Sequence, residues 1–240
     1  MNVAMERTIG SNTSRTGSIR LMKYLPPKWA MAMVERGSIR LGTLHDYRRQ
    51  EELGDARGDS TEGTAVFHER VEQAMYSPTN PPSAFVGAML QGAHLQASAL
   101  DIRNSDFSMP ASAPNVLIYC VSKGKSERVA REFGPACVEI SDLHEFAKRV
   151  AKVVEQHLPG SWLRVADCIY TDERRVAPDA ELDMNVVFLK PTRQAYQQEV
   201  RFAWYPRAGV EVHALTLEIP EVRELLTLSS DGDLGTLDQS

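Results

Sequence analysis

Short apolar runs rich in β-branched and aromatic side chains recur along the chain and are separated by polar segments. Runs of this length, bounded by glycine, proline or charged residues, predict β-strands. The predicted strands cover residues 19–24, 38–43, 65–71, 115–122, 136–140, 162–170, 186–189, 199–205 and 210–219.

Helical periodicity is confined to a few segments. A capping box formed by Asp142 and Glu145 predicts the start of an amphipathic helix that ends at Leu158. Other helices are predicted from Pro27 to the stop at Gly37, from Ser126 to Phe133 and over 220–227, whereas 84–92 fits a strand or a helix. Strands outnumber helices and often follow one another directly. The pattern therefore predicts an α+β fold with a mostly antiparallel sheet, in one piece or as two small sheets around a cleft.

The two ends of the chain differ from its middle in composition. Residues 1–18 are rich in Ser, Thr, Gly and Asn and predict a flexible arm, and residues 229–240 predict a flexible tail. Residues 19–228 are predicted to form a single globular domain. We expect no secretory signal and no membrane helix, because no apolar run is long enough. Three widely spaced cysteines, which we expect to be reduced, indicate a cytoplasmic location.

Composition and motifs exclude several function classes. The 240 residues carry a net charge of −5 and no basic stripe, so we do not expect general nucleic-acid binding. Neither glycine-rich phosphate-loop pattern occurs, which argues against a Rossmann dinucleotide site and against P-loop hydrolysis. No His or Cys pair has zinc-ligand spacing, and we expect no metal.

The charged segment 42–63 lies between two predicted strands. It contains Asp46, Tyr47, Arg48, Asp59 and Glu62. One interpretation is a solvated loop with weak ion pairs. The other is the wall of a polar cleft, in which a buried Arg–carboxylate network fixes the loop and leaves a carboxylate for a ligand.

A second charged segment, 190–202, contains Gln197, Glu199 and Arg201 at alternate positions. On a strand these three side chains share one face, while Val200 and Phe202 point to the core. An exposed polar sheet face is one interpretation. The other is a rigidly held glutamate in a cleft, which accepts a proton or a hydroxyl hydrogen bond or stabilises a cationic transition state. Lys190 is interpreted as a solvated lysine at a strand edge.

Several motifs occur in an order that resembles a large bacterial family of unknown function. They are LMKY at 21–24, RLGTLHDYRRQE with GDARGDSTEG at 40–63, YCVS at 119–122, FLK at 188–190 and YQQEVRF at 196–202. The resemblance covers about residues 19–205. Members of that family often sit near phage-defence or toxin genes, which implies a role as a toxin or defence effector.

The same layout is similar to the ADP-ribosyltransferase fold, which holds NAD in a cleft between two small antiparallel sheets. The resemblance implies that Glu199 stabilises an oxocarbenium-like transition state, with Gln197 completing a Q-x-E motif. It implies further site residues on the first and middle strands, Lys23 or Tyr24 and Ser122. Lys23 and Tyr24 replace the Arg or His that the fold carries on its first strand.

Two tyrosines and two arginines are assigned roles from the character of their side chains. Tyr24 and Tyr47 are expected to position the nicotinamide or adenine ring, although Tyr24 also fits a core aromatic. Arg48 and Arg201 are expected to contact phosphates or to brace carboxylates.

Three hypotheses follow. The first is a cytoplasmic ADP-ribosyltransferase-like enzyme that uses NAD as substrate and acts on an unknown macromolecule or small molecule. The second is a non-catalytic ligand- or partner-binding module with 42–63 as its recognition loop. The third is a Mg²⁺-dependent nuclease built from Asp46, Asp59, Glu62 and Glu199.

Overall fold

A computed structural model describes residues 20–48, 61–93, 98–173, 175–176 and 186–229. The predicted N-terminal arm and nearly all of the predicted C-terminal tail lie outside the described residues. The chain divides into two compact units. The first comprises Met1–Glu62, Asn115–Tyr170 and Lys190–Ser240, and the second comprises Gly63–Pro114 and Thr171–Leu189. A single domain over 19–228 stays a prediction.

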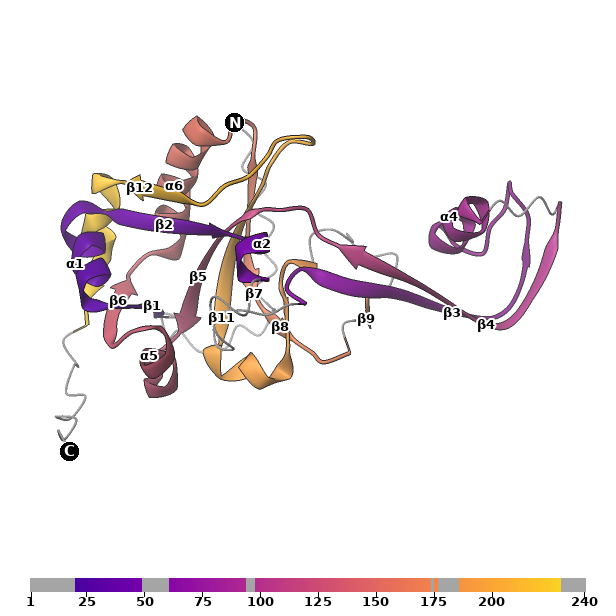
Figure 1. The fold of residues 1–240 in the computed structure, drawn as a ribbon, viewed down its shortest axis with the longest axis horizontal. Coiled ribbons are helices and arrows are strands. Elements are labelled where there is room, and N and C mark those ends of the chain that lie inside the picture. Colours follow the sequence, from indigo (N-terminus) through magenta and orange to yellow (C-terminus); the bar gives the residue numbers. More distant parts are fainter. Residues whose placement is uncertain (1–19, 49–60, 94–97, 174, 177–185, 230–240) are drawn as a thin grey trace. The chain divides into compact units, whose positions relative to one another are not determined.

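The first unit contains an eight-stranded antiparallel sheet, drawn in Figure 1. Its strand order is β12-β2-β5-β1-β6-β13, and β11 pairs with β5 and with β7. The bounds are β1 Leu21–Leu25, β2 Ser38–Thr43, β5 Leu117–Lys123, β6 Ala136–Ile140, β7 Trp162–Asp167, β11 Glu199–Tyr205, β12 Leu215–Glu218 and β13 Leu226–Leu228. The predicted α+β class with a mostly antiparallel sheet is confirmed.

Capping residues read from the sequence begin the helices of this unit. Pro27 opens α1 (Pro27–Arg36), Ser126 caps α5 (Glu127–Phe133), and Asp142 caps α6 (Leu143–His157) by accepting a hydrogen bond from the Glu145 amide. The helix predicted over 220–227 is the 3₁₀-helix η2 (Pro220–Leu225), after which Leu226 begins β13. The two-residue strands β8 (Ile169–Tyr170) and β10 (Leu189–Lys190) form a separate small sheet.

The two faces of the large sheet bury different groups. One face packs against α6 in the main core, where the rings of Tyr119, Phe146 and Phe202 lie 5.7–6.0 Å apart. Burying each such ring contributes roughly 2 kcal/mol. The other face carries a smaller cluster in which Met22 and Tyr24 contact α5. Glu199 and Arg201 of β11 point to this face, opposite Val200 and Phe202.

Strand β5 is shared between two partners on one of its sides. On one side, β11 pairs with β5 continuously from Leu117 to Ser122. On the opposite side β2 pairs only with Leu117 and Ile118, and β1 only with Ser122 and Lys123. Between them the described strands leave the stretch 119–121 of β5 without a ladder partner on that side. We call this opening the strand fork.

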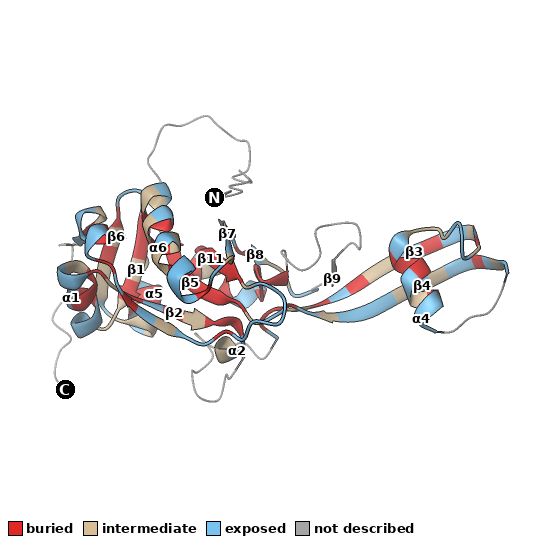
Figure 2. Ribbon diagram, turned by 90° about the horizontal axis from the view of Figure 1, so that it is seen from above, coloured by how far each residue is buried: buried red, intermediate tan, exposed pale blue. Residues whose placement is uncertain are grey.

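The second unit is built on a long hairpin, with burial shown in Figure 2. β3 (Thr64–Tyr76) pairs antiparallel with β4 (Leu100–Ser112) and, in parallel, with β9 (Arg175–Val176). Helix α4 (Ala84–Gly92) is capped by Ser83 and brings the Phe85 ring to 6.4 Å from Phe67. The undecided segment 84–92 is thus a helix. Strand β4 was missed, because its polar residues hide the period of two.

Two predicted strands differ from the structure. The segment 210–219 is a strand only over β12, and the segment 186–189 is a strand only at Leu189, which begins β10. In both segments apolar side chains such as Val187 and Val212 are buried without being in a ladder. In both segments, apolar residues that are buried outside a β-ladder therefore produced a sequence pattern typical of a strand.

Candidate functional site

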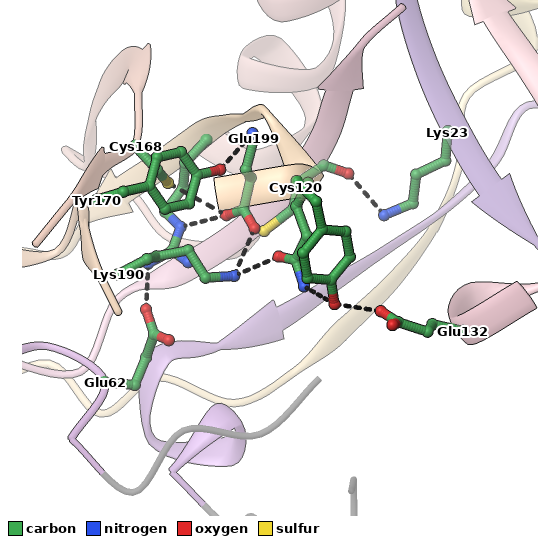
Figure 3. Close-up of polar contacts among 11 residues, drawn as sticks. Lys23, Glu62, Cys120, Glu132, Cys168, Tyr170, Lys190 and Glu199 are labelled. Atoms are coloured by element: carbon green, nitrogen blue, oxygen red, sulfur yellow. Dashed lines mark hydrogen bonds and ion pairs between the residues drawn. The ribbon is translucent and has the colours of Figure 1, made fainter. Parts of the chain in front are cut away.

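Four charged side chains are buried together in the first unit, and Figure 3 shows their contacts. They are Glu62, Lys190, Glu199 and Arg201, and we call them the charged cluster. Lys190 Nζ lies 2.7 Å from Glu199 Oε2, and Arg201 Nε lies 2.8 Å from Glu199 Oε1. Arg201 also pairs through Nη1 with the carboxylate of Glu62. The two cations and two anions balance one another, as burial demands.

Strand alternation explains why two members of the cluster meet. Glu199 and Arg201 point to one face of β11, whereas Val200 and Phe202 enter the main core as predicted. The polar face is not exposed: Glu199 is 6% and Arg201 1% exposed. The buried interpretation therefore replaces the solvated sheet face.

Gln197 contacts the charged cluster from a different element than predicted. It ends the 3₁₀-helix η1 (Thr192–Gln197) and does not belong to β11. Gln198 follows in the left-handed region with φ 41°, which turns the chain into the strand. The side chain of Gln197 nevertheless faces the cluster, since its Oε1 accepts a hydrogen bond of 2.8 Å from Lys190 Nζ.

The interpretation of Lys190 as a solvated edge lysine is wrong, because it is only 5% exposed. Burial by itself lowers the pKa of this ammonium, but the nearby carboxylates of Glu199 and Glu62 outweigh burial and raise the pKa. Lys190 is therefore a buried cation. In the sequence Lys190 directly follows the apolar run VVFL, which indicates that the neighbouring segment is buried.

The charges around Glu199 determine its protonation state. Burial would raise the pKa of the carboxyl, yet the charges of Arg201 and Lys190 outweigh it and hold the pKa well below its usual range. The carboxylate is ionised at neutral pH. A carboxylate with so low a pKa is a weak base but a good hydrogen-bond acceptor and a fixed negative charge.

Two thiols lie beside the same carboxylate. Cys168 Sγ is 3.4 Å from Glu199 Oε1, and Cys120 sits opposite Arg201 in the β5–β11 ladder. Burial raises the pKa of Cys120 to about 12 and that of Cys168 well above its ordinary value. The reactive form of cysteine is the thiolate, so neither residue is suited to nucleophilic catalysis at neutral pH.

A small pocket of about 40 Å³, partly open to solvent, lies at the strand fork. Its lining brings together five of the residues predicted for the site, namely Lys23, Tyr24, Ser122, Gln197 and Glu199. The ladders explain this meeting, because Met22 pairs with Ser122 and Ser122 pairs with Glu199. Directly paired residues project to the same sheet face, so three adjacent strands each contribute one side chain to a single row.

The first-strand residues have defined partners in the pocket. Lys23 Nζ donates to the carbonyl of Cys120 across the fork, at 2.7 Å, and lies 4.5 Å from the centre of the Tyr119 ring. Tyr24 Oη accepts a hydrogen bond from the amide of Ser126, and burial raises its pKa. These two hydrogen bonds connect β1 to Cys120 of β5 and to Ser126, the residue that caps α5.

Ser122 is the remaining polar member of the row. It is 8% exposed, and its hydroxyl makes no hydrogen bond to any residue that the structure describes. The hydroxyl is not one of the fully buried side-chain atoms that lack a hydrogen-bond partner, so it remains accessible to solvent. Its position in the pocket lining makes it available to a ligand.

The segment 42–63 contributes at its two ends. Asp46 forms a capping box with Thr43 at α2 (Leu44–Tyr47), which gives its carboxylate a structural role. Arg48 Nε donates to the carbonyl of Glu62 at 2.7 Å, and the Glu62 carboxylate joins the charged cluster. Arg48 and Glu62 thus connect the two described ends of the segment, and the Glu62 carboxylate is paired with Arg201.

The other predicted members of this segment lie apart from the pocket lining. Burial raises the pKa of Tyr47, and the charge of Glu199 adds to this effect, which places the phenol near the cluster. Gly42 leaves room for that ring, because a Cβ on Gly42 would lie 3.1 Å from Tyr47 Oη. Asp59 lies outside the described residues.

Two of the four carboxylates proposed for Mg²⁺ have a cationic partner. Glu62 and Glu199 both pair with Arg201, so a metal ion would have to compete with the guanidinium for their oxygens. In the part of the chain that the structure describes, no three or more His, Cys, Asp or Glu side chains are grouped as metal ligands.

Two further observations concern membrane-spanning helices and similarity to known proteins. None of the helices in the described residues is both long enough and apolar enough to cross a membrane. Comparison with protein-family models, with curated proteins and with solved structures finds no match. The family resemblance and the similarity to ADP-ribosyltransferases therefore stay predictions.

Proposed function

We propose that the first unit is an ADP-ribosyltransferase-like enzyme that uses NAD, with its active site in the pocket at the strand fork. One observation carries the proposal. Side chains from the first strand, a middle strand and a late strand, which the resemblance singles out separately, line one pocket next to a buried, ionised glutamate.

The chemistry of Glu199 supports a particular role. Its carboxylate is charged and is a poor proton acceptor, so it acts by accepting a ribose hydroxyl hydrogen bond and by stabilising positive charge on the ribose ring. Cleavage of the bond between ribose and nicotinamide develops such a charge. The charged cluster holds the carboxylate rigid before the ligand arrives, which avoids a reorganisation cost in the transition state.

Other residues in the lining have matching tasks in this proposal. Ser122 supplies its unpartnered hydroxyl to the ligand, and Tyr24 packs beside the ring that enters the fork. The cytoplasm, which contains NAD, is the proposed location, in keeping with three free cysteines. A role as a toxin or phage-defence effector belongs to the proposal through the family resemblance alone.

Nicotinamide release from labelled NAD, with and without bacterial lysate, tests the proposal. For Glu199→Gln we expect a loss of about 10²-fold or more in kcat, because the variant loses the negative charge. Ser122→Ala leaves the charged cluster intact, and we expect its KM for NAD to rise by about tenfold. Circular dichroism and the melting temperature establish that each variant is folded.

The matched control is Glu218→Gln. Glu218 lies on strand β12, and its carboxylate forms an exposed ion pair with Arg36 of helix α1. It should release nicotinamide at the wild-type rate. Wild-type protein that neither binds NAD nor releases nicotinamide, with or without lysate, contradicts the proposal.

One observation favours the non-catalytic binding module as a second candidate. Both carboxylate oxygens of Glu199 already accept hydrogen bonds, from Lys190 and from Arg201. A site with this arrangement can hold a ligand without transforming it. In that case ligand-observed NMR detects binding of NAD that weakens in Ser122→Ala, while nicotinamide release stays at background.

A further inference from the structure

Lys190 connects two side chains of the pocket without lining it. Its ammonium donates to Gln197 Oε1 at 2.8 Å and to Glu199 Oε2 at 2.7 Å. The two acceptors belong to different elements, η1 and β11, and the chain changes direction between them at Gln198. Gln197 and Glu199 line the pocket, whereas Lys190 is not part of the lining.

The geometry points to Lys190 as a positioning residue, which sets the orientation of Gln197 and Glu199 toward a ligand in the pocket. For its effect on turnover this inference rests on the proposed function. The effect of Lys190 on the orientation of Gln197 and Glu199 does not depend on the proposed function, because it can be measured without any ligand.

The hydrogen bonds explain how one ammonium can orient both groups. Gln197 Nε2 donates to Tyr196 Oη at 3.3 Å, and that hydroxyl contacts the carboxylate of Glu132 on α5. Lys190 thus holds the oxygen end of the Gln197 amide while Tyr196 holds the nitrogen end, which selects one of the two amide orientations. The α5 contact extends this chain of hydrogen bonds to another wall of the pocket.

Glu199 is held from two directions in a comparable way. Arg201 Nε binds Oε1 and Lys190 binds Oε2, so the plane of the carboxylate is defined by two charge-assisted hydrogen bonds. Loss of Lys190 removes one charge-assisted hydrogen bond from Gln197 and one from Glu199. A displacement of about 1 Å in a reacting group costs up to about 10²-fold in rate.

The experiment compares Lys190→Met and Lys190→Arg with wild-type protein. Methionine keeps much of the length of the side chain and removes the charge and the donors. NMR spectra of ligand-free protein follow the side-chain amide of Gln197, assigned by its absence in Gln197→Met. We expect a resolved, ordered amide in wild type and a shifted, disordered one in Lys190→Met.

Nicotinamide release provides the second readout. In Lys190→Met we expect kcat to fall by about 10²-fold while KM changes by less than about threefold, with partial recovery of kcat in Lys190→Arg. Lys123→Met is the matched control, because Lys123 forms a partly exposed pair with Asp167 on the same sheet. It should change neither the amide signal nor kcat.

The outcomes separate the inference from the proposed function. A folded Lys190→Met with the wild-type Gln197 signal and wild-type kcat overturns the positioning role. Wild-type protein that lacks NAD turnover contradicts the proposed function, and the amide signal alone then decides the inference. If Lys190→Met does not fold, Lys190→Arg decides: an unchanged amide signal together with an unchanged kcat overturns the inference.

Discussion

Arg201 is the residue on which the charged cluster depends, because it pairs with both Glu62 and Glu199. It is 1% exposed, so no water compensates for its loss. Removal of one partner from a buried ion pair leaves an uncompensated charge, which is far more costly than loss of an exposed pair.

For Arg201→Met we therefore expect the free energy of unfolding to fall by about 3–5 kcal/mol, measured by urea denaturation. Arg36→Met removes an arginine from an exposed pair with Glu218 and should cost at most about 1 kcal/mol. Similar losses for the two variants would show that the cluster is hydrated and not buried.

The lowered pKa of Glu199 predicts a pH dependence of stability. Its folded pKa lies below the unfolded value of about 4.3, so the unfolded state takes up the proton first as pH falls. The stabilisation is fully present above about pH 5 and is lost progressively in acid. Urea denaturation at several pH values should show a smaller acid loss for Glu199→Gln than for wild type between about pH 5 and 3. If the free energy of unfolding depended equally on pH in both proteins, the ionised carboxylate would not be stabilised by its neighbours.

At the scale of elements, the α5 helix forms one wall of the pocket and ends at Gly134. This glycine has φ 136°, and a Cβ on it would lie 2.2 Å from the backbone carbon of Leu25 at the end of β1. The close approach fixes the distance between the two walls that carry Val129 and Tyr24. Only glycine satisfies both the backbone angle and the contact.

Gly134→Ala should reduce the free energy of unfolding by about 3 kcal/mol, since both strain and overlap oppose it. Gly124→Ala is the comparison: its φ of 70° is also left-handed, but no atom lies within 4 Å of the added Cβ. We expect a loss of about 1 kcal/mol there, from the backbone alone. Thermal and urea unfolding of both variants measure the difference.

At the scale of the molecule, the chain forms two units with separate apolar clusters. Phe67 and Phe85 pack within the second unit, whereas the Phe146 and Phe202 rings pack within the first. Each cluster buries its own apolar area. Local stability is therefore expected to differ between the units.

Phe85→Ala should destabilise the hairpin by about 3 kcal/mol through the cavity it leaves. Hydrogen exchange should speed up for amides of β3 and β4 and stay unchanged for those of β5 and β11. Met75→Ala, on the same hairpin but 62% exposed, should leave both sets unchanged. Faster exchange in β5 after Phe85→Ala would show that the two units unfold together.

Much of the local structure follows from the sequence alone. The alternation in β11 separates Glu199 and Arg201 from Val200 and Phe202, and the caps at Ser126 and Asp142 begin helices where predicted. These features depend on side-chain direction and on hydrogen bonds within a few residues, which the order of residues determines.

The site itself was decided by tertiary structure. Glu62 and Arg201 are 139 positions apart and meet only because β11 and the end of the 42–63 segment converge. Lys190 is buried where it meets Gln197 and Glu199, and the opening of the strand fork depends on which strands pair with β5. The sequence determined which charged side chains share a strand face; the tertiary fold decided that water is excluded from them, because desolvation depends on segments that meet only in the folded chain.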